Sequence, residues 1–301
     1  MPTEPKPAQN PAPDLAPDLA PDLAALRAEI DRIDEAMHRL LIERSGIIEN
    51  LIKVKGTQDS GSAFRPAREA AMMRRLVERH HGILPLDTVE SIWRVIISTF
   101  THVQAPYAVH AAIGSHEAAM RDSARFHFGF TVPLRTHDNA AQVVAAVTAS
   151  RGDLGLVPAM DVAGAGAWWS ALEAETAPKI IARLPFVERA DHPASLPVFA
   201  ISRTSPDAAA TEVQVHGLRV SGWSKAAAQA LAGLAETVAV PDGAFDGAAL
   251  LVSLPQGRSL DEIASALVEA GASIRARALV GSHASRYTVT GGNAPRPAAR
   301  P

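Results

Sequence analysis

The sequence predicts a multidomain protein in which an all-helical N-terminal module precedes an α/β domain. Residues 23–55 repeat apolar side chains at the spacing that places them on one face of a long helix. From about Val109 onward, short strand-like segments alternate with helix-like ones, which is typical of a layered α/β fold. A chain of 301 residues has room for both domains.

The composition narrows the possible functions. The chain is 47% hydrophobic, has a formal net charge of -3 and contains no cysteine. Disulfides, thiolate metal sites and cysteine nucleophiles are therefore excluded. The weak net charge does not favour nucleic acid or a membrane surface as a partner. The N-terminus lacks an apolar run of signal-peptide length, so we expect a cytoplasmic location.

Proline-rich segments flank the two domains. Residues 1–21 contain the repeat PDLAPDLAPDLA, whose low hydrophobicity and repeated proline predict a disordered leader. Residues 291–301, GGNAPRPAARP, predict a disordered tail. We therefore divide the chain into a leader (1–21), a helical domain (22–106), an α/β domain (107–290) and a tail (291–301).

The long helix predicted over residues 23–55 carries charges on its apolar face. Arg27, Arg44 and Lys55 all fall on the stripe that steps of three and four residues generate. Each of them alone can be explained as a boundary residue whose stem packs while its head reaches water. Three cations on one seam favour a small anion as their partner, because burying unpaired charges is costly.

The length of this helix implies a second subunit. Arg27 and Arg44 lie roughly 25 Å apart along the helix axis, whereas Arg44 and Lys55 lie roughly 16 Å apart. Only the second pair can converge on one small ligand. We therefore expect Arg27 to reach that ligand from an antiparallel copy of the helix in a homodimer. Either that copy or later helices must cover the apolar stripe.

Two further helices are predicted in the N-terminal module. The second begins at Pro66, a good first-turn residue, and stops at Gly82. The third follows Pro85, has Asp87 as its N-cap and runs to about Gln104.

Three polar residues of these helices are candidates for a site. Arg68 and Glu69 lie in the first turn of the second helix, where both are expected to point along its apolar face into one space. The alternative is a solvated charge pair. Gln104, at the end of the third apolar stripe, is either a satisfied boundary residue or a neutral donor aimed into a pocket.

The three helical segments carry a family resemblance. LRAEIDRIDEAMHRLLIERSGIIENLIKVK, FRPAREAAMMRRLVERHHGILP and SIWRVIISTFTHVQ together resemble the all-helical (AroQ-type) chorismate mutase, most closely the version at the front of the bifunctional P-proteins, which join chorismate mutase to prephenate dehydratase. The resemblance covers about residues 22–105 and implies an intertwined dimer of three-helix subunits. Arg65 and Phe100 depart from the family's pattern, in which some members carry an aspartate and a small polar residue at these positions.

The resemblance implies a catalytic group of three residues. Lys55 and Gln104 match the donors to the ether oxygen of chorismate, and Arg44 matches a residue that binds a substrate carboxylate. The implied reaction is the intramolecular Claisen rearrangement of chorismate to prephenate, which needs no cofactor, metal or nucleophile. A protein can accelerate it by holding the reactive conformer and by placing donors where the breaking C–O bond gains negative charge.

The resemblance also implies three substrate-binding residues. Arg27 matches the arginine that reaches into the partner subunit's site. Arg68 and Glu69 match the pair that contacts a carboxylate and the hydroxyl of the substrate.

The C-terminal half resembles a shortened prephenate dehydratase. Its alternating strands and helices are similar to the first lobe of that enzyme, which has a periplasmic-binding-protein-like fold. The glycine-rich opening is reduced to GSHEA, Met160, Asp161 and Val162 replace an asparagine-serine pair, and VFAISR stands where a threonine-arginine-phenylalanine motif is expected. The interval from GLVP to VFAISR is also too short for a second lobe, so we expect dehydratase activity to be lost.

The last part of the chain resembles a regulatory module. Residues 247–289 are predicted to form strand, helix, strand and strand, similar to the front of an ACT domain, before the tail begins. The preceding segments LRVSG and KAAAQALAGLAE would then complete a rearranged α/β sandwich. This resemblance implies binding or regulation.

Two other motifs in this half have structural explanations. Ser224 in GWSKA is similar to a hydrolase nucleophile elbow, but the second glycine is missing and His283 has no identified carboxylate partner. Trp168 and Trp169 could cap a ligand cleft, although core or interface packing is the simpler interpretation.

The sequence therefore predicts a chorismate mutase of phenylalanine and tyrosine biosynthesis that acts as a homodimer without a cofactor or metal. Three alternatives remain open. One is a bifunctional chorismate mutase/prephenate dehydratase. Another is a non-catalytic protein that binds a small anion or another enzyme. The third is a related lyase that acts on isochorismate.

Overall fold

The computed structural model describes residues 19–55, 63–160, 166–203, 210–242 and 247–290. Their contacts divide the chain into two compact units, Met1–Val54 and Lys55–Pro301. The first unit holds a single described element, helix α1 (Leu19–Lys55), which starts within the predicted leader, three residues before the predicted domain boundary at residue 22. The rest of the predicted leader and the whole predicted tail lie outside the described residues.

Helices α2 and α3 belong to the second unit, and local signals set their ends. Helix α2 (Pro66–Arg79) begins at the predicted proline, whose missing N–H is not needed in a first turn. It ends at the cap His80, before the predicted stop at Gly82. Helix α3 (Leu86–Gln104) ends where predicted, because Ala105 is extended and Pro106 follows. Its N-cap is Pro85 rather than Asp87.

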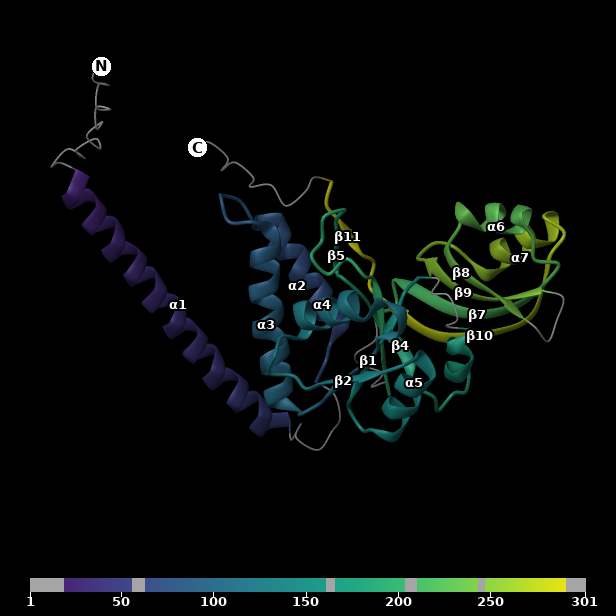
Figure 1. Cartoon of the computed structure of the whole chain (residues 1–301), viewed down its shortest axis with the longest axis horizontal. Coiled ribbons are helices and arrows are strands. Elements are labelled where there is room, and N and C mark those ends of the chain that lie inside the picture. The colour runs from purple at the N-terminus through teal and green to yellow at the C-terminus, as the bar shows by residue number, and fades with distance from the viewer. Residues whose placement is uncertain (1–18, 56–62, 161–165, 204–209, 243–246, 291–301) are drawn as a thin grey trace, which may run out of the picture. The chain divides into compact units, whose positions relative to one another are not determined.

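The α/β part of the second unit is built on one nine-stranded sheet (Figure 1). Its strand order is β2-β1-β3-β6-β4-β10-β7-β9-β8. The first five strands in this order are β2 (Leu134–His137), β1 (Val109–Ala112), β3 (Leu154–Pro158), β6 (Val198–Ser202) and β4 (Lys179–Leu184). Strand β1 runs parallel to β2 and β3, and β6 runs antiparallel to β3 and β4.

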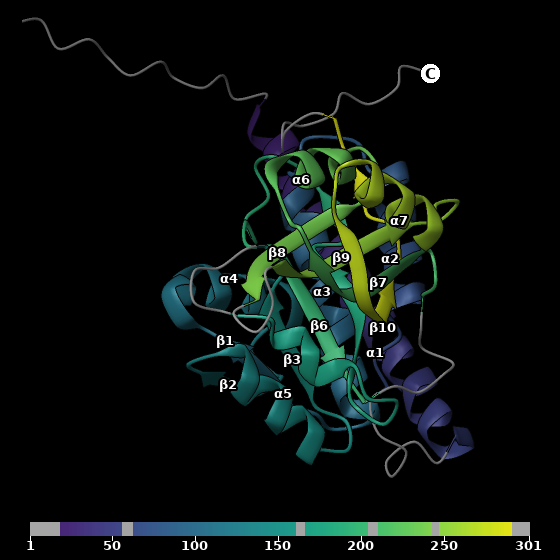
Figure 2. The same cartoon turned by 90° about the vertical axis from the view of Figure 1, so that its right-hand side faces the viewer.

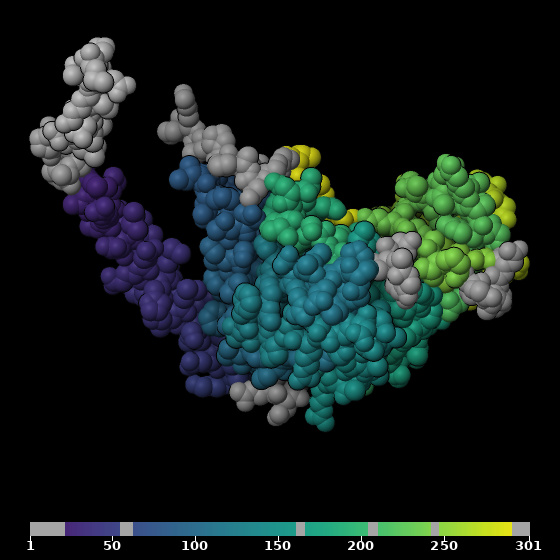
Figure 3. Space-filling view, in the orientation of Figure 1, coloured from purple at the N-terminus to yellow at the C-terminus, as the bar shows by residue number. Residues whose placement is uncertain are grey.

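Helices cover both faces of these five strands, so their side chains are buried in two separate clusters. Leu154 and Leu156 pack in one cluster with residues of α2, α3 and α4 (Glu117–Phe128). Val157 and Phe199 pack in the other with α5 (Ala140–Ala149) and Trp169. Successive strand residues point to opposite faces, which explains why neighbours such as Leu156 and Val157 fall in different clusters. The surface of α2 and α3 is continuous with that of the α/β part in Figure 3.

The remaining strands form a complete βαββαβ unit. Strand β7 (Val213–Ser221), α6 (Lys225–Ala232), β8 (Glu236–Asp242), β9 (Gly247–Pro255), α7 (Leu260–Glu269) and β10 (Ser273–His283) follow one another in the chain. Their sheet order, β10-β7-β9-β8, is that of a ferredoxin-like unit. Helices α6 and α7 lie side by side over one face of its strands (Figures 1 and 2).

This unit corrects the prediction for residues 247–289. Strands β9 and β10 with α7 form the second half of the unit rather than the front of an ACT-like domain, because β7 pairs with both of them. The preceding segments supply the first half, as the sequence suggested, together with β8, which was not predicted. The last short strand, β11 (Tyr287–Thr288), pairs instead with β5 (Val187–Glu188) in a separate ribbon.

The two parts of the nine-stranded sheet meet at a glycine. Strand β10 pairs with β4 through Gly281 and Ile180. A Cβ atom at Gly281 would lie 2.2 Å from the carbonyl oxygen of Ile180, so only glycine permits this approach.

Candidate active site

The six predicted site residues are distributed over both compact units. Arg27 and Arg44 lie on α1, where Arg27 is exposed and Arg44 is half-buried. Lys55 is the last residue of α1 and the first of the second unit, and its side chain lies outside the described part of the structure. The other three residues belong to α2 and α3. The structure of each unit therefore shows only part of the predicted set.

Arg68 and Glu69 do not share one space, which differs from the sequence prediction. Arg68 is exposed, whereas Glu69 is 4% exposed and faces the inside of the second unit. Successive helical residues point about 100° apart, so two neighbours in a first turn can face different surroundings. The alternative interpretation, a charge pair in solvent, is also wrong for Glu69, because this residue is buried.

The partner of Glu69 is Arg94 of α3, which the sequence analysis missed. Nη1 of Arg94 donates to Oε2 of Glu69 at 2.6 Å, and Arg94 is 1% exposed. Nη2 of Arg94 donates to the carbonyl oxygen of His127 at 3.1 Å, and the guanidinium lies 5.3 Å from the centre of the Phe186 ring. One buried arginine therefore connects α2 and α3 to α4 and to the segment after β4.

A pattern in the sequence could have revealed this face of α3. Glu90, Arg94, Ile97 and Thr101 are all buried and follow one another at helical spacing. The apolar stripe predicted for this helix shares Ile97 with this side but otherwise runs beside it, and of its members Val89 and Ile97 are buried whereas Trp93, Ile96, Phe100 and Gln104 are half-buried. A buried side that contains two opposite charges was not recognised, because charged residues are rarely buried unless paired.

Gln104 lies at the end of α3 and is half-buried. Its Nε2 donates to the carbonyl oxygen of Phe100, one turn earlier, at 3.0 Å. This bond runs from the last residue of α3 back to a carbonyl of the preceding turn. It orients the amide at the last turn of α3.

A second buried ion pair joins α3 to the loop after β5. Nη1 of Arg189 donates to Oε2 of Glu90 at 2.7 Å, and both side chains are fully buried. The ring of His192 accepts the N–H of Ala194 at Nδ1. Its Nε2 therefore carries the hydrogen and donates to Oε1 of Glu90 at 3.3 Å.

His127 lies between these two ion pairs. Its ring stacks on that of His192 with centroids 6.1 Å apart. Burial lowers the pKa of His127 well below its ordinary value, and the charge of Arg94 lowers it further. The ring is therefore neutral at physiological pH, so the array around α3 contains two arginines and two carboxylates in balance.

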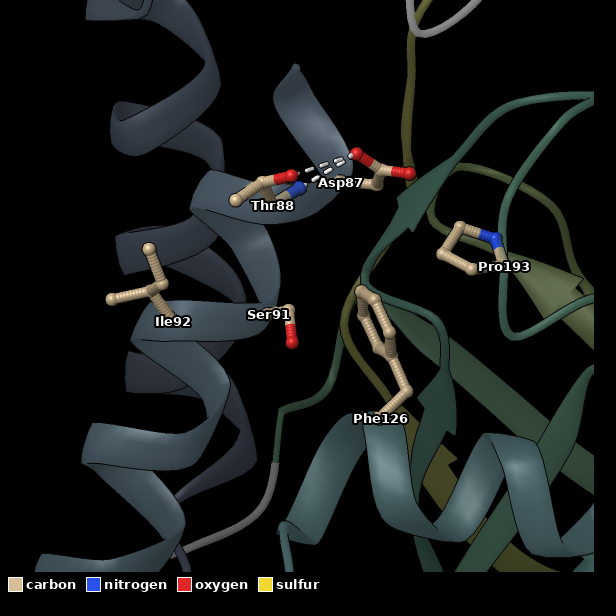
Figure 4. A pocket seen from close by; sticks show the side chains of 6 residues that line it. All are labelled: Asp87, Thr88, Ser91, Ile92, Phe126 and Pro193. Atoms are coloured by element: carbon tan, nitrogen blue, oxygen red, sulfur yellow. Dashed lines mark hydrogen bonds between the residues drawn. The ribbon is translucent and has the colours of Figure 1, made fainter. Parts of the chain in front are cut away.

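A pocket of about 340 Å³ opens beside the first turns of α3 (Figure 4). Figure 4 shows Phe126 from α4 and Pro193 facing these turns. Oδ1 of Asp87 accepts the N–H of Thr88 at 2.7 Å. The lining residues are Asp87, Thr88, Ser91, Ile92, Phe126 and Pro193. None of the six predicted site residues lines this pocket.

Another polar cluster joins the ends of three strands. Asp153 accepts the N–H of Ala108 at 2.8 Å, and its other oxygen lies 3.0 Å from Nε2 of His110. Nδ1 of His110 lies 2.8 Å from Nε2 of His137. Burial and the neighbouring His110 lower the pKa of His137. Because a carboxylate only accepts, Nε2 of His110 donates to Asp153, and these contacts tie β1 and β2 to the start of β3.

The other motifs of the α/β domain have structural roles. Ser224 is the N-cap of α6 and accepts the N–H of Ala227, so it serves as a helix cap. Trp168 and Trp169 are buried in the core, as the simpler interpretation predicted. Of the three residues Met160, Asp161 and Val162, the last two lie outside the described structure.

The described part of the chain shows no group of three or more histidine, cysteine, aspartate or glutamate side chains that could hold a metal ion. None of the helices among these described residues is long and apolar enough to cross a membrane.

Comparison with known proteins identifies the N-terminal segment. Residues 26–105 match the family model of chorismate mutase type II, and all six predicted site residues lie within this range. The bifunctional chorismate mutase/prephenate dehydratase of Neisseria gonorrhoeae is 34% identical over 103 residues, which cover 34% of this chain and 27% of that protein. The protein of the same description from Pseudomonas aeruginosa is 30% identical over 139 residues, covering 44% of this chain and 38% of the relative.

The matches thus span well under half of the length of these relatives. Prephenate dehydratase from Streptococcus mutans aligns with 60% of this chain and 99% of its own, at 12% identity and a TM-score of 0.33, a level that carries no argument about fold. The family match confirms the resemblance predicted from the three helical segments: the N-terminal part of the chain carries a type II chorismate mutase domain.

Proposed function

We propose that this protein is a chorismate mutase, an isomerase that converts chorismate to prephenate in the synthesis of phenylalanine and tyrosine. The observation that carries the proposal is the family match over residues 26–105, which includes every residue of the predicted site. The reaction is unimolecular, so the protein needs to supply only conformation and electrostatic stabilisation.

In this proposal, three residues act on the reacting bonds. Arg44 binds a carboxylate of chorismate through its planar guanidinium, which selects the compact conformer in which the new bond can form. Lys55 and Gln104 donate to the ether oxygen, which gains negative charge as the C–O bond breaks. The bond from Gln104 to the Phe100 carbonyl supports this role by fixing one side of its amide.

Three further residues complete the substrate contacts. Arg68 is exposed at the start of α2, where it can meet a carboxylate. Glu69 accepts from the substrate hydroxyl. Arg27 enters from a second subunit, because it lies too far along α1 from Arg44 to reach the same small ligand.

A homodimer is supported by the surface of α1. Leu26, Ile30 and Leu40 are 63%, 57% and 62% exposed in a single chain. A helix with so much exposed apolar surface needs a partner, and a second copy of α1 offers an identical apolar stripe. The exposed large apolar residues of α1 are Leu23, Leu26, Ile30, Ile33, Met37, Leu40, Leu41, Ile42, Ile47 and Val54.

In this proposal, the mutase domain is residues 22–106 and the dehydratase-like domain is residues 107–290.

The loss of dehydratase activity is supported by the short interval between β3 and β6, which holds the strands β4 and β5 and one 3₁₀ turn among its described elements. For the rest of the domain we propose a binding or regulatory role, because it contains the βαββαβ unit. A cytoplasmic location remains a prediction from the sequence.

Product analysis tests these assignments directly. Purified protein is incubated with chorismate, and the products are separated and identified. Prephenate alone is the expected result. Phenylpyruvate would establish the bifunctional alternative, which the names of the relatives favour. In a parallel incubation with isochorismate, release of pyruvate together with an aromatic acid would establish a lyase. A folded dimer that binds chorismate without converting it would contradict catalysis and support the binding-protein alternative.

A further inference from the structure

The buried pair of Glu69 and Arg94 links the proposed mutase site to the α/β domain. Glu69 has a side chain only 6% exposed, so its carboxylate has lost most of its hydration. Arg94 replaces that hydration with a charge-assisted hydrogen bond to Oε2. In the proposed function, Oε1 is the oxygen that contacts the substrate hydroxyl.

The orientation of Arg94 is determined by the α/β domain. His127 is the second-last residue of α4, so its carbonyl oxygen has no partner within the helix and accepts from Nη2 of Arg94. The C-terminal end of a helix also attracts positive charge. On another side, the ring of Phe186 packs against the guanidinium. These contacts come from residues after 106, outside the segment that matches the mutase family.

We propose that Arg94 is a positioning residue of the mutase site: it holds the carboxylate of Glu69 in one orientation, and contacts from the α/β domain hold Arg94 in place. The inference rests on the proposed function, because the orientation of Glu69 affects activity only if chorismate binds to it. It goes beyond that function by assigning the α/β domain a part in building the site.

A purely structural role for Arg94 is the alternative, and the chain offers a matched control. Arg189 is also a buried arginine, is paired with a glutamate of α3, and anchors the same helix to the α/β domain. It contacts Glu90 and not the proposed substrate-binding Glu69. Loss of either arginine should destabilise the fold, but only loss of Arg94 should change how activity depends on pH.

The experiment compares Arg94→Leu, Arg94→Lys and Arg189→Leu in the full-length protein, with kcat and KM measured across the pH range over which each variant stays folded. Arg94→Leu should lower kcat/KM about a hundredfold at neutral pH, because a misplaced contact group costs that much. Its activity should recover as the pH rises, because an unpaired buried carboxylate takes up a proton and then releases it at high pH. Arg94→Lys keeps the charge and should retain the wild-type pH profile.

Two outcomes would overturn the proposal while the mutase assignment stands. One is an active, folded Arg94→Leu protein with the wild-type pH profile. The other is an Arg189→Leu protein whose profile shifts in the same way. If Arg94→Leu does not fold, Arg94→Lys is measured with and without Glu69→Gln, and equal effects of the lysine in both backgrounds would exclude action through Glu69. A wild-type protein with no mutase activity would refute the proposed function itself, and this inference with it.

Discussion

All of helix α3 and most of helix α1 lie in the segment that matches chorismate mutase, yet the two helices have very different surfaces. Helix α1 leaves residues such as Leu26 and Leu40 more than half exposed in the single chain. Helix α3 buries Glu90 and Arg94, which are 0% and 1% exposed. One helix therefore has apolar surface that needs a partner, and the other has charges whose partners come from distant residues of the same chain. The comparison shows that helices of one matched segment can be stabilised in two ways, by covering an apolar surface or by pairing buried charges.

Subunit mixing tests the α1 side of this comparison and should give the largest effect. Arg27→Ala and Arg44→Ala homodimers should each be nearly inactive if both residues are needed in every site. In a mixed dimer, one site collects both defects and the other collects neither. Random exchange makes about half of the dimers mixed, so about a quarter of all sites should work.

The mixing experiment needs independent proof that the subunits exchange, for example by native mass spectrometry of tagged chains. If exchange is complete and activity stays at the level of the two parents, Arg27 serves its own chain and the shared-site proposal is wrong.

Removal of a buried charge tests the α3 side. Arg189→Leu leaves the carboxylate of Glu90 buried without its main partner, so we expect the free energy of unfolding to fall by about 3–5 kcal/mol. The matched change on α1 is Arg32→Leu, which removes an exposed pair with Glu29 and should leave that free energy unchanged. Urea unfolding of both variants measures the difference. Equal stabilities would show that the two helices do not differ in this way.

Lys55 lies at the boundary between the two compared regions, as the last residue of α1 and the first of the second unit. We expect Lys55→Ala to lower kcat about a hundredfold or more, or roughly 3 kcal/mol, with a much smaller change in KM. The reason is that its contact strengthens as the ether oxygen gains charge. Lys53→Ala, which changes an exposed lysine on the same turn, is the control. An unchanged kcat for Lys55→Ala would reject its catalytic role.

Acid stability extends the comparison to the buried histidines of the α/β domain. Burial is the main cause that lowers the pKa of His283 from 6.5 to about 4, and the nearby Arg183 adds to it. Between these values the unfolded chain binds a proton that the folded protein does not. Stability is therefore unaffected above about pH 6.5 and is lost as the pH falls from there to about 4, by roughly 3 kcal/mol from this residue.

Replacement of His283 isolates its share of this acid sensitivity. In His283→Leu the stability should decline less between these two pH values, while the contribution of His127 remains. Unfolding by urea at a series of pH values gives the slopes for both proteins. Parallel slopes would mean that His283 does not stay neutral in the folded state.

Local signals explain how much of the fold was predictable. Pro66 at the start of α2 and Pro106 after the end of α3 act within one turn, so the sequence placed these ends correctly. The first strands of the α/β domain were also found, because a switch in apolar spacing is a local signal. The six site residues were proposed from the spacing of cations on α1 and from the motifs of the three helices.

Long-range pairing explains what was missed. The partners Glu90 and Arg189 are separated by 99 residues, and nothing near Glu90 indicates which cation it meets. Similarly, β7 lies at the centre of the βαββαβ unit. Because β7 pairs with both β9 and β10, residues 247–283 form the second half of that unit. Arg94 went unrecognised as the partner of Glu69 for the same reason.

The start of α7 offers a test of local signals where the expected effect is smallest. Neither α2 nor α3 has a side-chain cap hydrogen bond, whereas α7 begins with a full capping box. Ser259 Oγ accepts the N–H of Glu262 at 3.2 Å, and the Glu262 carboxylate accepts the N–H of Ser259 at the same distance. Ser259→Ala should therefore lower the free energy of unfolding by about 1 kcal/mol, while Ser259→Thr, which keeps the hydroxyl, should lower it less. If alanine proves as stable as serine, the buried residues Ile263 and Leu267 alone set where α7 begins. Helix α7 would then resemble α3, whose first turn has no side-chain cap hydrogen bond.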